Sequence, residues 1–427
     1  MGDSTNDLTA ARPFEGPADR AADGSAGSSG SRPPTLERST EASRRAERAF
    51  LPEIQALRMW AVGLVVVFHL WPFRYFTGGY IGVDAFFVIS GFLITGHLVR
   101  EVERTGRVRL GAFYARRVRR LLPMSLSLLL LLVPVSMAIL PREVWDDVAR
   151  EIVASTFYVQ NIWLAHLVTS PDNVGDTLVQ HYWSLSTEEQ FYLVWPALVL
   201  LGVALASRLR PFRPVRTIGF VLLTVTVLSF AFSLYAQVRF PAEQYFLTPT
   251  RAWEFASGGL LVLGLRRFAP GPRLSLVLRW GGLALLLVGS WVLVQGDPFP
   301  GWRALVPVVA TGAVIAAGDC HGRDRLGYAF TAPVVQWLGR ISYSIYLWHW
   351  PIIFLLPFVL GHDLTLAWKA ICVVLILVLA HLSQKYVEDA TRFVPRLRAS
   401  TRLTLLSALG AMLVVSAAAA VEFLLAT

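Results

Sequence analysis

Long blocks of apolar residues constrain this chain more than any other feature of its sequence. A helix needs about 20 apolar residues to cross the hydrocarbon core of a bilayer. Eleven blocks approach or reach that length, so the sequence predicts an all-α polytopic membrane protein with 10–11 transmembrane helices. The expected spans are residues 53–72, 80–99, 121–140, 183–206, 217–236, 250–265, 276–294, 302–318, 338–360, 366–386 and 402–425.

The low content of charged residues supports this class. Only 16% of the residues are charged, whereas soluble domains carry about 25%. A disordered chain and a disulfide scaffold are excluded, and a soluble enzyme is disfavoured. The stretch 149–166 is apolar and amphipathic and could lie at the membrane interface, so the number of spans is defined to about one.

The distribution of basic residues sets the expected orientation. With the amino terminus in the cytosol, the inside loops hold 24 basic residues and the outside loops hold six. The net charge of +10 is then mainly a topology signal. We therefore expect contact with the bilayer and its anionic inner leaflet, and no nucleic-acid partner. With eleven spans, the carboxyl terminus lies outside.

Residues 1–49 are rich in Gly, Ser, Pro, Arg and Glu and contain almost no aromatic residues. Such a segment cannot bury a core, so the sequence predicts a disordered cytosolic tail. The tail lacks the early apolar stretch of a signal peptide, so the first span must direct insertion. Cys320 and Cys372 form no C-x-x-C pair, which gives no support for a metal or redox site.

Charged residues inside membrane spans are costly and are therefore functional candidates. Arg58 and His69 in the first span share one helix face and are separated by about 16 Å along the axis. Together they favour a polar path, although Arg58 alone could extend to the interface and His69 alone could be structural.

The second span begins with GGYIGVDAFFVISGF, residues 78–92. Asp84 lies at a depth similar to that of His69 and could stabilise a protonated imidazole, or it could simply favour the start of a helix. The glycines of this motif allow a close approach between helices or a broken helix start. They are Gly78, Gly79, Gly82 and Gly91.

Three arginines follow the second span in FYARRVRRLLP, residues 113–123. Arg116 and Arg120 are four residues apart, and Arg117 and Arg120 are three apart, which predicts three guanidinium groups on one helix side. This cluster suits a phosphorylated ligand. A positive-inside segment in contact with lipid headgroups would have the same pattern.

Later spans carry further candidates. Glu188 and Glu189 lie in HYWSLSTEEQFYLVWP, residues 181–196, where a buried carboxylate needs a partner. Arg251 and Glu254 are three residues apart and could form an internal ion pair or belong to the path.

The ninth span has one polar stripe on an otherwise aromatic helix, which suits a pathway lining or a structural hydrogen-bonded feature. The stripe consists of Ser342, Tyr346 and His349. His381 is expected to be structural. No role is predicted for His166, His181, His321 or His362.

Taken in order, these motifs closely resemble those of the acyltransferase 3 family, which comprises bacterial integral-membrane O-acyltransferases such as the O-antigen acetylases. The motifs are RMWAVGLVVVFH, GGYIGVDAFFVISGF, FYARRVRRLLP, WSLSTEEQFYLVWP, TRAWEFASGG and ISYSIYLWHWP. Each motif is weak alone, but six in order over residues 50–395 are specific. The resemblance implies an enzyme of a bacterial cell membrane with no permanently bound cofactor or metal. Its co-substrate would be acyl-CoA, typically acetyl-CoA, and its acceptor a carbohydrate or glycoside, most often a cell-surface glycan.

The resemblance also implies roles for individual positions. Arg58 and His69 match the essential Arg-x10-His pair of the family, and the 116–120 arginines match its basic motif. Glu188, Arg251 and Glu254 match polar positions that recur in the family. Residues 396–427 resemble an additional helix that in some members leads to an SGNH esterase-like domain. No such domain follows here, so we expect a separate extracytoplasmic acyl-handling partner or none.

These assignments predict acyl transfer. The arginines would hold acyl-CoA, and His69 would act as a general base or as a transient acyl carrier. Asp84 or Glu188 would fix the imidazole tautomer. The alternative is a proton-coupled secondary transporter, because such proteins also bury His, Glu and Arg. A transporter would be expected to show an inverted repeat, and the later half contains no second Arg-x10-His pattern.

Overall fold

The computed structural model describes residues 34–72, 76–171, 175–208, 213–294, 296–318 and 325–426. The chain divides into two compact units, residues 1–46 and 47–427, and the second carries every feature discussed below. Residues 1–33 of the expected tail lie outside the described residues, and a helix begins at Pro34. Cys320 and His321 also lie outside the described residues.

The described residues form an all-helical structure, as predicted. Each of the eleven expected spans falls on a helix. Nine helices in the described part of the chain are long and apolar enough to cross a membrane, and Gly301–Ala317 and α8 are shorter apolar segments. The main helices are α1 (Pro34–Leu70), α2 (Gly82–Thr105), α3 (Leu110–Ile139), α6 (Tyr182–Ser207), α7 (Pro214–Arg239), α8 (Thr248–Leu265), α9 (Pro272–Val292), α10 (Leu305–Ala317), α12 (Pro333–Leu360), α13 (Leu366–Ser383) and α16 (Thr401–Ala426).

Short helices connect these segments. The amphipathic stretch at 149–166 forms two of them, α4 (Trp145–Thr156) and α5 (Gln160–Leu167). A 3₁₀ turn, η1 (Gly79–Ile81), precedes α2, so the glycine-rich motif does begin its helix with a break. The other short elements are η2 (Arg142–Val144), η3 (Glu243–Tyr245), η4 (Gly301–Ala304), α11 (Arg325–Thr331), the π-helical η5 (Gln384–Glu388), α14 (Asp389–Arg392) and α15 (Pro395–Ala399).

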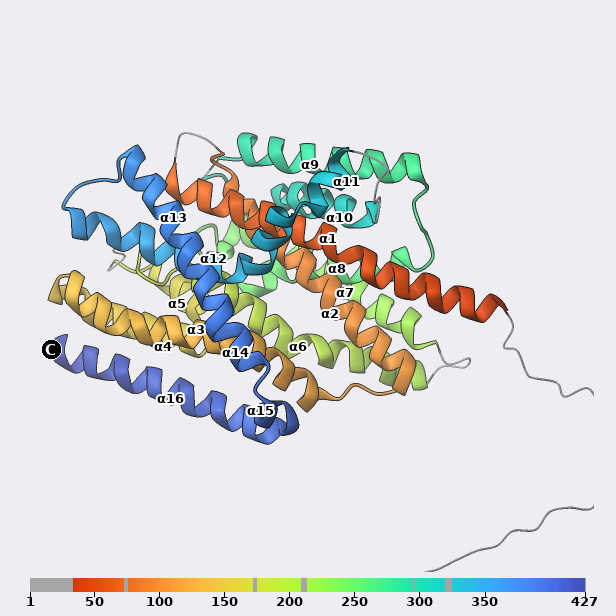
Figure 1. Cartoon of the computed structure of the whole chain (residues 1–427), viewed down its shortest axis with the longest axis horizontal. Coiled ribbons are helices and arrows are strands. Elements are labelled where there is room, and N and C mark those ends of the chain that lie inside the picture. The colour runs from red at the N-terminus through yellow and green to blue at the C-terminus, as the bar shows by residue number, and fades with distance from the viewer. Residues whose placement is uncertain are drawn as a thin grey trace, which may run out of the picture. The chain divides into compact units, whose positions relative to one another are not determined.

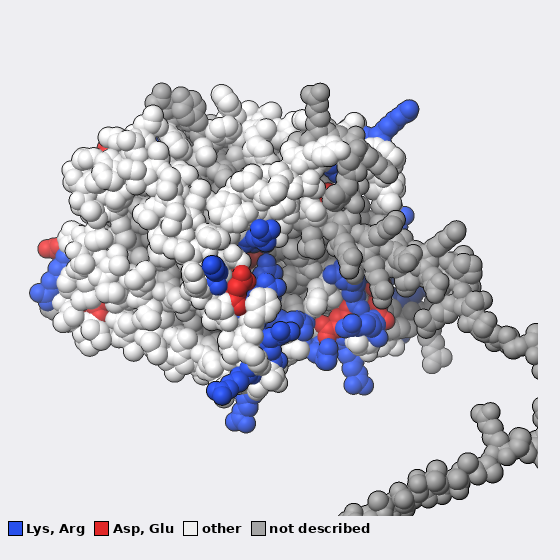
Figure 2. Space-filling model, viewed as in Figure 1, with Lys and Arg blue, Asp and Glu red and all other residues white. Residues whose placement is uncertain are grey.

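Burial differs strongly between the helices. The apolar window of α2 is 78% buried, whereas those of α13 and α16 are each 17% buried. Helix α2 therefore lies in the interior, and α13 and α16 lie at the periphery with apolar side chains directed outward. In water this apolar surface would promote aggregation, but in a bilayer it contacts lipid tails. Figure 2 shows a face that is mostly uncharged, with basic side chains gathered over α14 and α15 and around the end of α2.

The last helix, α16, packs against α3 and α4 (Figure 1). Near its end, the buried Glu422 accepts a hydrogen bond from Ser136 of α3. Arg142 donates from Nε to the carbonyl oxygen of Leu425 at 2.8 Å. These polar contacts fix the register of an otherwise apolar helix, because a carboxylate in this setting needs its hydrogen-bond partner.

Small residues allow α2 and α8 to cross closely. A Cβ atom added at Gly91 would lie 1.9 Å from the carbonyl oxygen of Phe255, and one added at Gly258 would lie 2.1 Å from that of Val88. Both distances are far below van der Waals contact, so only glycine fits at either position. Small residues at helix crossings are typical of membrane bundles, and this crossing places the polar residues of α2 and α8 beside each other.

We predict that Gly91→Ala lowers the thermal stability of the protein. The methyl group must displace the backbone of α8, and overpacking of this kind costs about 1–3 kcal/mol. The matched control is Gly63→Ala in α1, where an added Cβ meets nothing within 4 Å and better helix propensity should leave stability equal or higher. Thermal unfolding followed by size-exclusion chromatography in detergent measures both. Equal melting temperatures for the two variants would contradict the prediction.

Candidate active site

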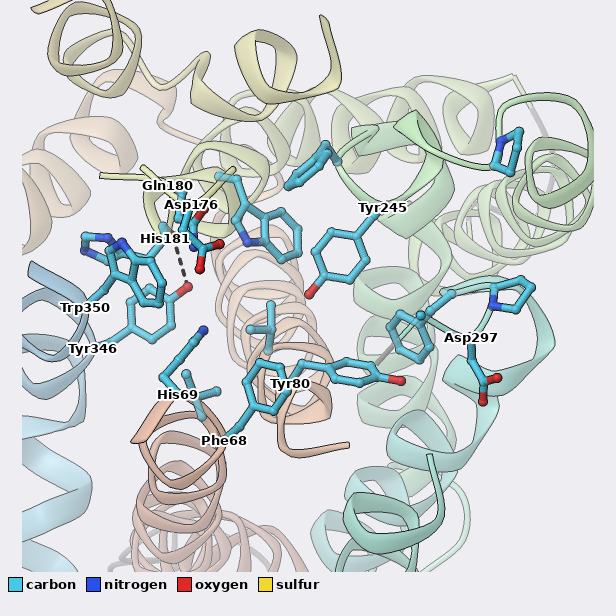
Figure 3. A pocket seen from close by; sticks show the side chains of 18 residues that line it. Phe68, His69, Tyr80, Asp176, Gln180, His181, Tyr245, Asp297, Tyr346 and Trp350 are labelled. Carbon is cyan, nitrogen blue, oxygen red and sulfur yellow. Dashed lines mark hydrogen bonds between the residues drawn. The ribbon is translucent and has the colours of Figure 1, made fainter. Parts of the chain in front are cut away.

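One cavity of about 450 Å³ lies where α1 ends. Its wall is mainly aromatic, and Figure 3 shows these rings arranged around a central space. Polar groups enter it from several separate segments, namely His69, Asp176, Gln180, His181 and Asp297. We call this cavity the His69 pocket. A concave, largely apolar cavity with a few convergent polar groups is the usual form of a small-molecule site.

His69 is directed into this pocket from the last turn of α1 (Figure 3). Its ring centroid lies 4.9 Å from that of Phe68, 4.9 Å from that of Trp350 and 5.2 Å from that of His349. The Nδ1 atom of His69 is buried and has no hydrogen-bond partner among the described residues. The imidazole is thus held by ring contacts and lines the pocket.

The polar stripe of α12 contributes to the same region. His349 lies beside His69, and Tyr346 lines the pocket. The Tyr346 hydroxyl forms hydrogen bonds with the carbonyl oxygen of His181 at 3.0 Å and with Ser184 Oγ at 2.6 Å. Ser342 is fully buried on the same helix but does not line the pocket.

His181, for which the sequence predicted no role, is part of this site. It lies at the start of α6, and its ring centroid is 5.7 Å from that of His349. Its Nε2 donates to the carbonyl oxygen of Leu347 at 3.1 Å. Burial lowers the pKa of His181 to about 3, so the ring is neutral. The signal that could have identified it is its position as the first residue of the HYWSLS motif, directly before α6.

Asp84 occupies a different position from the expected one. Its carboxylate bonds to Arg251 Nη1 at 2.9 Å, and the same nitrogen contacts Glu254 at 3.2 Å. All three side chains are at most 1% exposed. The expectation that Asp84 orients His69 is therefore corrected: the close α2–α8 crossing gives Asp84 an arginine partner.

This ion cluster supports the wall of the pocket. The Arg251 guanidinium lies 4.9 Å from the ring centroid of Tyr245 and 5.0 Å from that of Phe299, both of which line the pocket. Cations placed over aromatic faces in a desolvated site are attracted by about 2 kcal/mol. The predicted Arg251–Glu254 ion pair is present, with Asp84 as a third member.

A second polar cluster surrounds Arg58, about 16 Å from His69 along α1. Glu188 and Glu388 attract the Arg58 guanidinium group, whereas the like charge of Arg120 repels it. The Arg117 guanidinium lies 3.5 Å from the ring centroid of Tyr192. We call the group formed by Arg58, Arg117 and Arg120 the arginine cluster.

The two glutamates of α6 belong to this second cluster. Glu188 accepts hydrogen bonds from Ser90 and Tyr192, and Glu189 interacts electrostatically with Arg117 and Arg120. Glu188 is seven residues beyond His181, about 10 Å along the helix. The expectation that Glu188 fixes the His69 tautomer is therefore corrected.

Arg116 is separated from the other two arginines of its motif. It is 41% exposed, contacts Glu101 at 3.7 Å and bonds to His97 Nε2 at 2.9 Å. These residues line a cavity of about 290 Å³ together with arginines from the ends of α2 and α3. Adjacent residues on a helix diverge by 100°, so Arg116 turns to Glu101 while Arg117 turns to Tyr192. The expectation of three guanidinium groups on one side is corrected for Arg116.

Within the part of the chain that the structure describes, no group of three or more His, Cys, Asp or Glu side chains is placed to hold a metal ion. The chemistry offered by the two clusters is acid–base or nucleophilic catalysis at His69 and anion binding at the arginine cluster.

Comparison with known families identifies the class of this protein. The acyltransferase domain of the acyltransferase 3 family matches residues 51–383, and the chain belongs to this family. Membership in an acyltransferase family, together with described helices long and apolar enough to cross a membrane, confirms the predicted enzyme class over the transporter alternative.

Individual relatives are bacterial O-acetyltransferases. The chain is 34% identical over 359 residues to the peptidoglycan O-acetyltransferase OatA of Listeria monocytogenes, a match covering 82% of this chain and 57% of that protein. It is 31% identical to the putative peptidoglycan O-acetyltransferase YrhL of Bacillus subtilis, covering 80% and 55%. It is 29% identical to the putative O-acetyltransferase SACOL0978 of Staphylococcus aureus, covering 80% and 57%. The chain thus spans little more than half the length of these relatives. No solved structure matches it.

Proposed function

We propose that this protein transfers an acetyl group from acetyl-CoA to a hydroxyl group of a cell-wall carbohydrate. The observation that carries the proposal is the placement of two unlike clusters on one helix. His69 opens into an aromatic cavity at one end of the membrane segment of α1, and Arg58 joins two further arginines at the other end. We take the identity of the acyl group and the class of acceptor from the relatives, which are named as peptidoglycan O-acetyltransferases.

The arginine cluster is the proposed donor site. Guanidinium groups bind phosphate oxygens through charge-assisted, often bidentate hydrogen bonds, and acetyl-CoA carries several phosphates. The acetyl thioester stands at the far end of a long pantetheine arm, which can bridge the roughly 16 Å from Arg58 to His69. Donor binding and chemistry can therefore occur at opposite ends of α1.

His69 is the proposed catalytic residue. As a general base, it takes the proton of the acceptor hydroxyl while the oxygen attacks the thioester carbonyl. The carbon–oxygen bond forms, the carbon–sulfur bond breaks, and the imidazolium returns its proton to the departing thiolate. The second route has the imidazole attack the thioester first and carry the acetyl group transiently. Both routes require the same histidine at the same place.

The His69 pocket is the proposed acceptor site. Tyr245 and Trp350 present aromatic surface to the cavity, and Asp176 and Gln180 supply oxygen and nitrogen atoms near them. Sugar rings pair apolar C–H surface with polar hydroxyl groups, so a wall of this mixed composition suits a carbohydrate better than a purely apolar ligand. A separate extracytoplasmic protein that receives or passes on the acetyl group is compatible with the same pocket.

Purified protein in liposomes, supplied with radiolabelled acetyl-CoA and soluble peptidoglycan oligosaccharides, tests the proposal. We expect base-labile label on the oligosaccharides, detected by mass spectrometry. Folded protein that leaves the glycan unlabelled would contradict the proposed acceptor. Accumulation of unmodified substrate inside the vesicles without covalent transfer would contradict the proposed reaction.

We predict that Arg117→Ala raises the KM for acetyl-CoA by about 10-fold or more, because a hydrogen bond to a charged group contributes about 1.5–3 kcal/mol. Arg116→Ala is the matched control, since Arg116 lines the separate cavity with His97 and Glu101. We expect it to change this KM less than about threefold, within the range of exposed ion pairs. Initial rates at varied acetyl-CoA concentration measure both effects. A larger rise in the KM for acetyl-CoA in Arg116→Ala than in Arg117→Ala would place the donor in the cavity lined by His97 and Glu101.

A further inference from the structure

The region around His69 contains buried nitrogen atoms that the described residues do not satisfy. His69 Nδ1, His181 Nδ1 and His349 Nε2 all lack a hydrogen-bond partner in the described part of the chain. Buried polar atoms are nearly always paired in native proteins. Three unpaired imidazole nitrogens in neighbouring rings therefore call for a functional explanation. We name His69, His181 and His349 the imidazole cluster.

The tautomer of His349 follows from its hydrogen bond. Its Nδ1 bonds to the carbonyl oxygen of Tyr346, which can only accept, so Nδ1 carries the proton. In the neutral ring, the lone pair is then on Nε2. This atom is buried and unpaired among the described residues. His349 thus presents a hydrogen-bond acceptor whose direction is set by the backbone of α12.

His69 needs such an acceptor when it acts as a base. A base that receives a proton on Nε2 must already hold its other proton on Nδ1. The Nδ1 atom of His69 and the Nε2 atom of His349 are both buried and are not hydrogen-bonded to each other in this structure, but the two rings are only 5.2 Å apart between centroids. Of the two neighbouring histidines with an unused acceptor, His349 is the one whose ring contacts that of His69.

The start of α6 holds His349 in place. The His181 ring packs 5.7 Å from the His349 ring, and its Nε2 bonds to the Leu347 carbonyl. The Tyr346 hydroxyl bonds back to the His181 carbonyl at 3.0 Å. These reciprocal bonds fasten the α12 segment that carries His349, so the position of the Nε2 lone pair is rigid.

We propose that His349 is the positioning residue of His69: once substrate fills the pocket, its Nε2 accepts a hydrogen bond from Nδ1–H of His69, a bond that these two atoms do not make in this structure, and so fixes the catalytic tautomer. The inference rests on the proposed function, because the role exists only if His69 takes the proton of the acceptor hydroxyl. During that step the proton moves to Nε2 of His69 and then to the departing thiolate, while His349 neither gains nor loses a proton. His349 therefore takes the place that sequence reasoning gave to Asp84 or Glu188.

Two amide substitutions of His349 separate positioning from packing. In His349→Asn, the amide nitrogen stands near the position of Nδ1 and can keep the bond to the Tyr346 carbonyl, but no acceptor reaches His69. In His349→Gln, the amide oxygen reaches the position of Nε2 and restores the acceptor. Each replaces the ring with an uncharged amide of comparable polarity, so a purely structural role would affect both alike.

We expect His349→Gln to keep kcat within about tenfold of wild type, and His349→Asn and His349→Ala to lower kcat by about 100-fold or more. The KM for acetyl-CoA should change less than twofold in all three, because the arginine cluster is untouched. The assay uses radiolabelled acetyl-CoA and peptidoglycan oligosaccharides with protein in liposomes, at equal amounts of folded protein by size-exclusion chromatography.

Equal rates for the Asn and Gln variants, whether high or low, would overturn the positioning role. A rise in the KM for acetyl-CoA that accounts for the whole loss would overturn it as well. Wild-type protein that transfers no acetyl group would instead overturn the proposed function together with this inference. Failure of the proposed function is thus seen in the wild type, and failure of the positioning role only in the variants.

Discussion

Replacing His69 by alanine should abolish acetyl transfer while folded protein remains in the membrane. Both routes proposed for the reaction pass through this imidazole, and removal of a general base alone lowers rates by about 10²–10⁴-fold. We expect the larger loss, because alanine also removes the nucleophile on which the second route depends. The measurement is the amount of acetylated glycan formed per folded protein, with the melting temperature recorded in parallel.

The control is His381→Ala. His381 lies exposed on α13, where its Nδ1 accepts a hydrogen bond from Trp337 at 3.3 Å. It is not among the residues that line the His69 pocket. This variant should transfer acetyl groups at the wild-type rate. Full activity of His69→Ala would remove His69 from the mechanism, and equal losses in both variants would point to a general effect on the protein.

Replacing Arg251 by alanine should cause the largest loss of stability of any single change discussed. Asp84 and Glu254 would then face each other in a buried site without their shared cation. Breaking a buried ion pair by removing one partner costs about 3–5 kcal/mol. The aromatic wall of the His69 pocket would also lose its support, because the guanidinium lies against Tyr245 and Phe299. Thermal unfolding in detergent measures the effect.

Asp84→Asn is the informative comparison. With that change, one carboxylate and one guanidinium remain, so the charges of the cluster balance and the amide can still accept from Arg251. We expect a much smaller fall in melting temperature than for Arg251→Ala. Similar melting temperatures for the two variants would show that the ion cluster contributes little to folding. Lost acetyl transfer with unchanged stability in Asp84→Asn would assign the cluster to chemistry instead.

The sequence was most informative where local periodicity decides the outcome. Apolar blocks of membrane length fall on helices because a helix satisfies its own backbone hydrogen bonds. The placement of His69 and Arg58 in separate clusters follows from residue spacing on one helix. The ends of α1 could therefore be interpreted without a three-dimensional structure.

The partners of these residues were less accessible, because they depend on how helices cross. Asp84 pairs with Arg251 through a crossing set by Gly91 and Gly258, and no pattern within α2 alone specifies that partner. His181 enters the site because α6 begins opposite the end of α1, which is a property of the bundle. Arg116 departs from its neighbours because Glu101, outside the arginine motif, attracts it.

The size of the His69 pocket links the two substrates of the proposed reaction. A single cavity of about 450 Å³ has to admit the acyl group and the hydroxyl-bearing ring together. Each methylene added to the acyl chain then occupies space that the sugar would otherwise fill. Selectivity for a short acyl group would consequently arise from competition for shared volume, and a smaller acceptor should let the enzyme use a longer acyl donor.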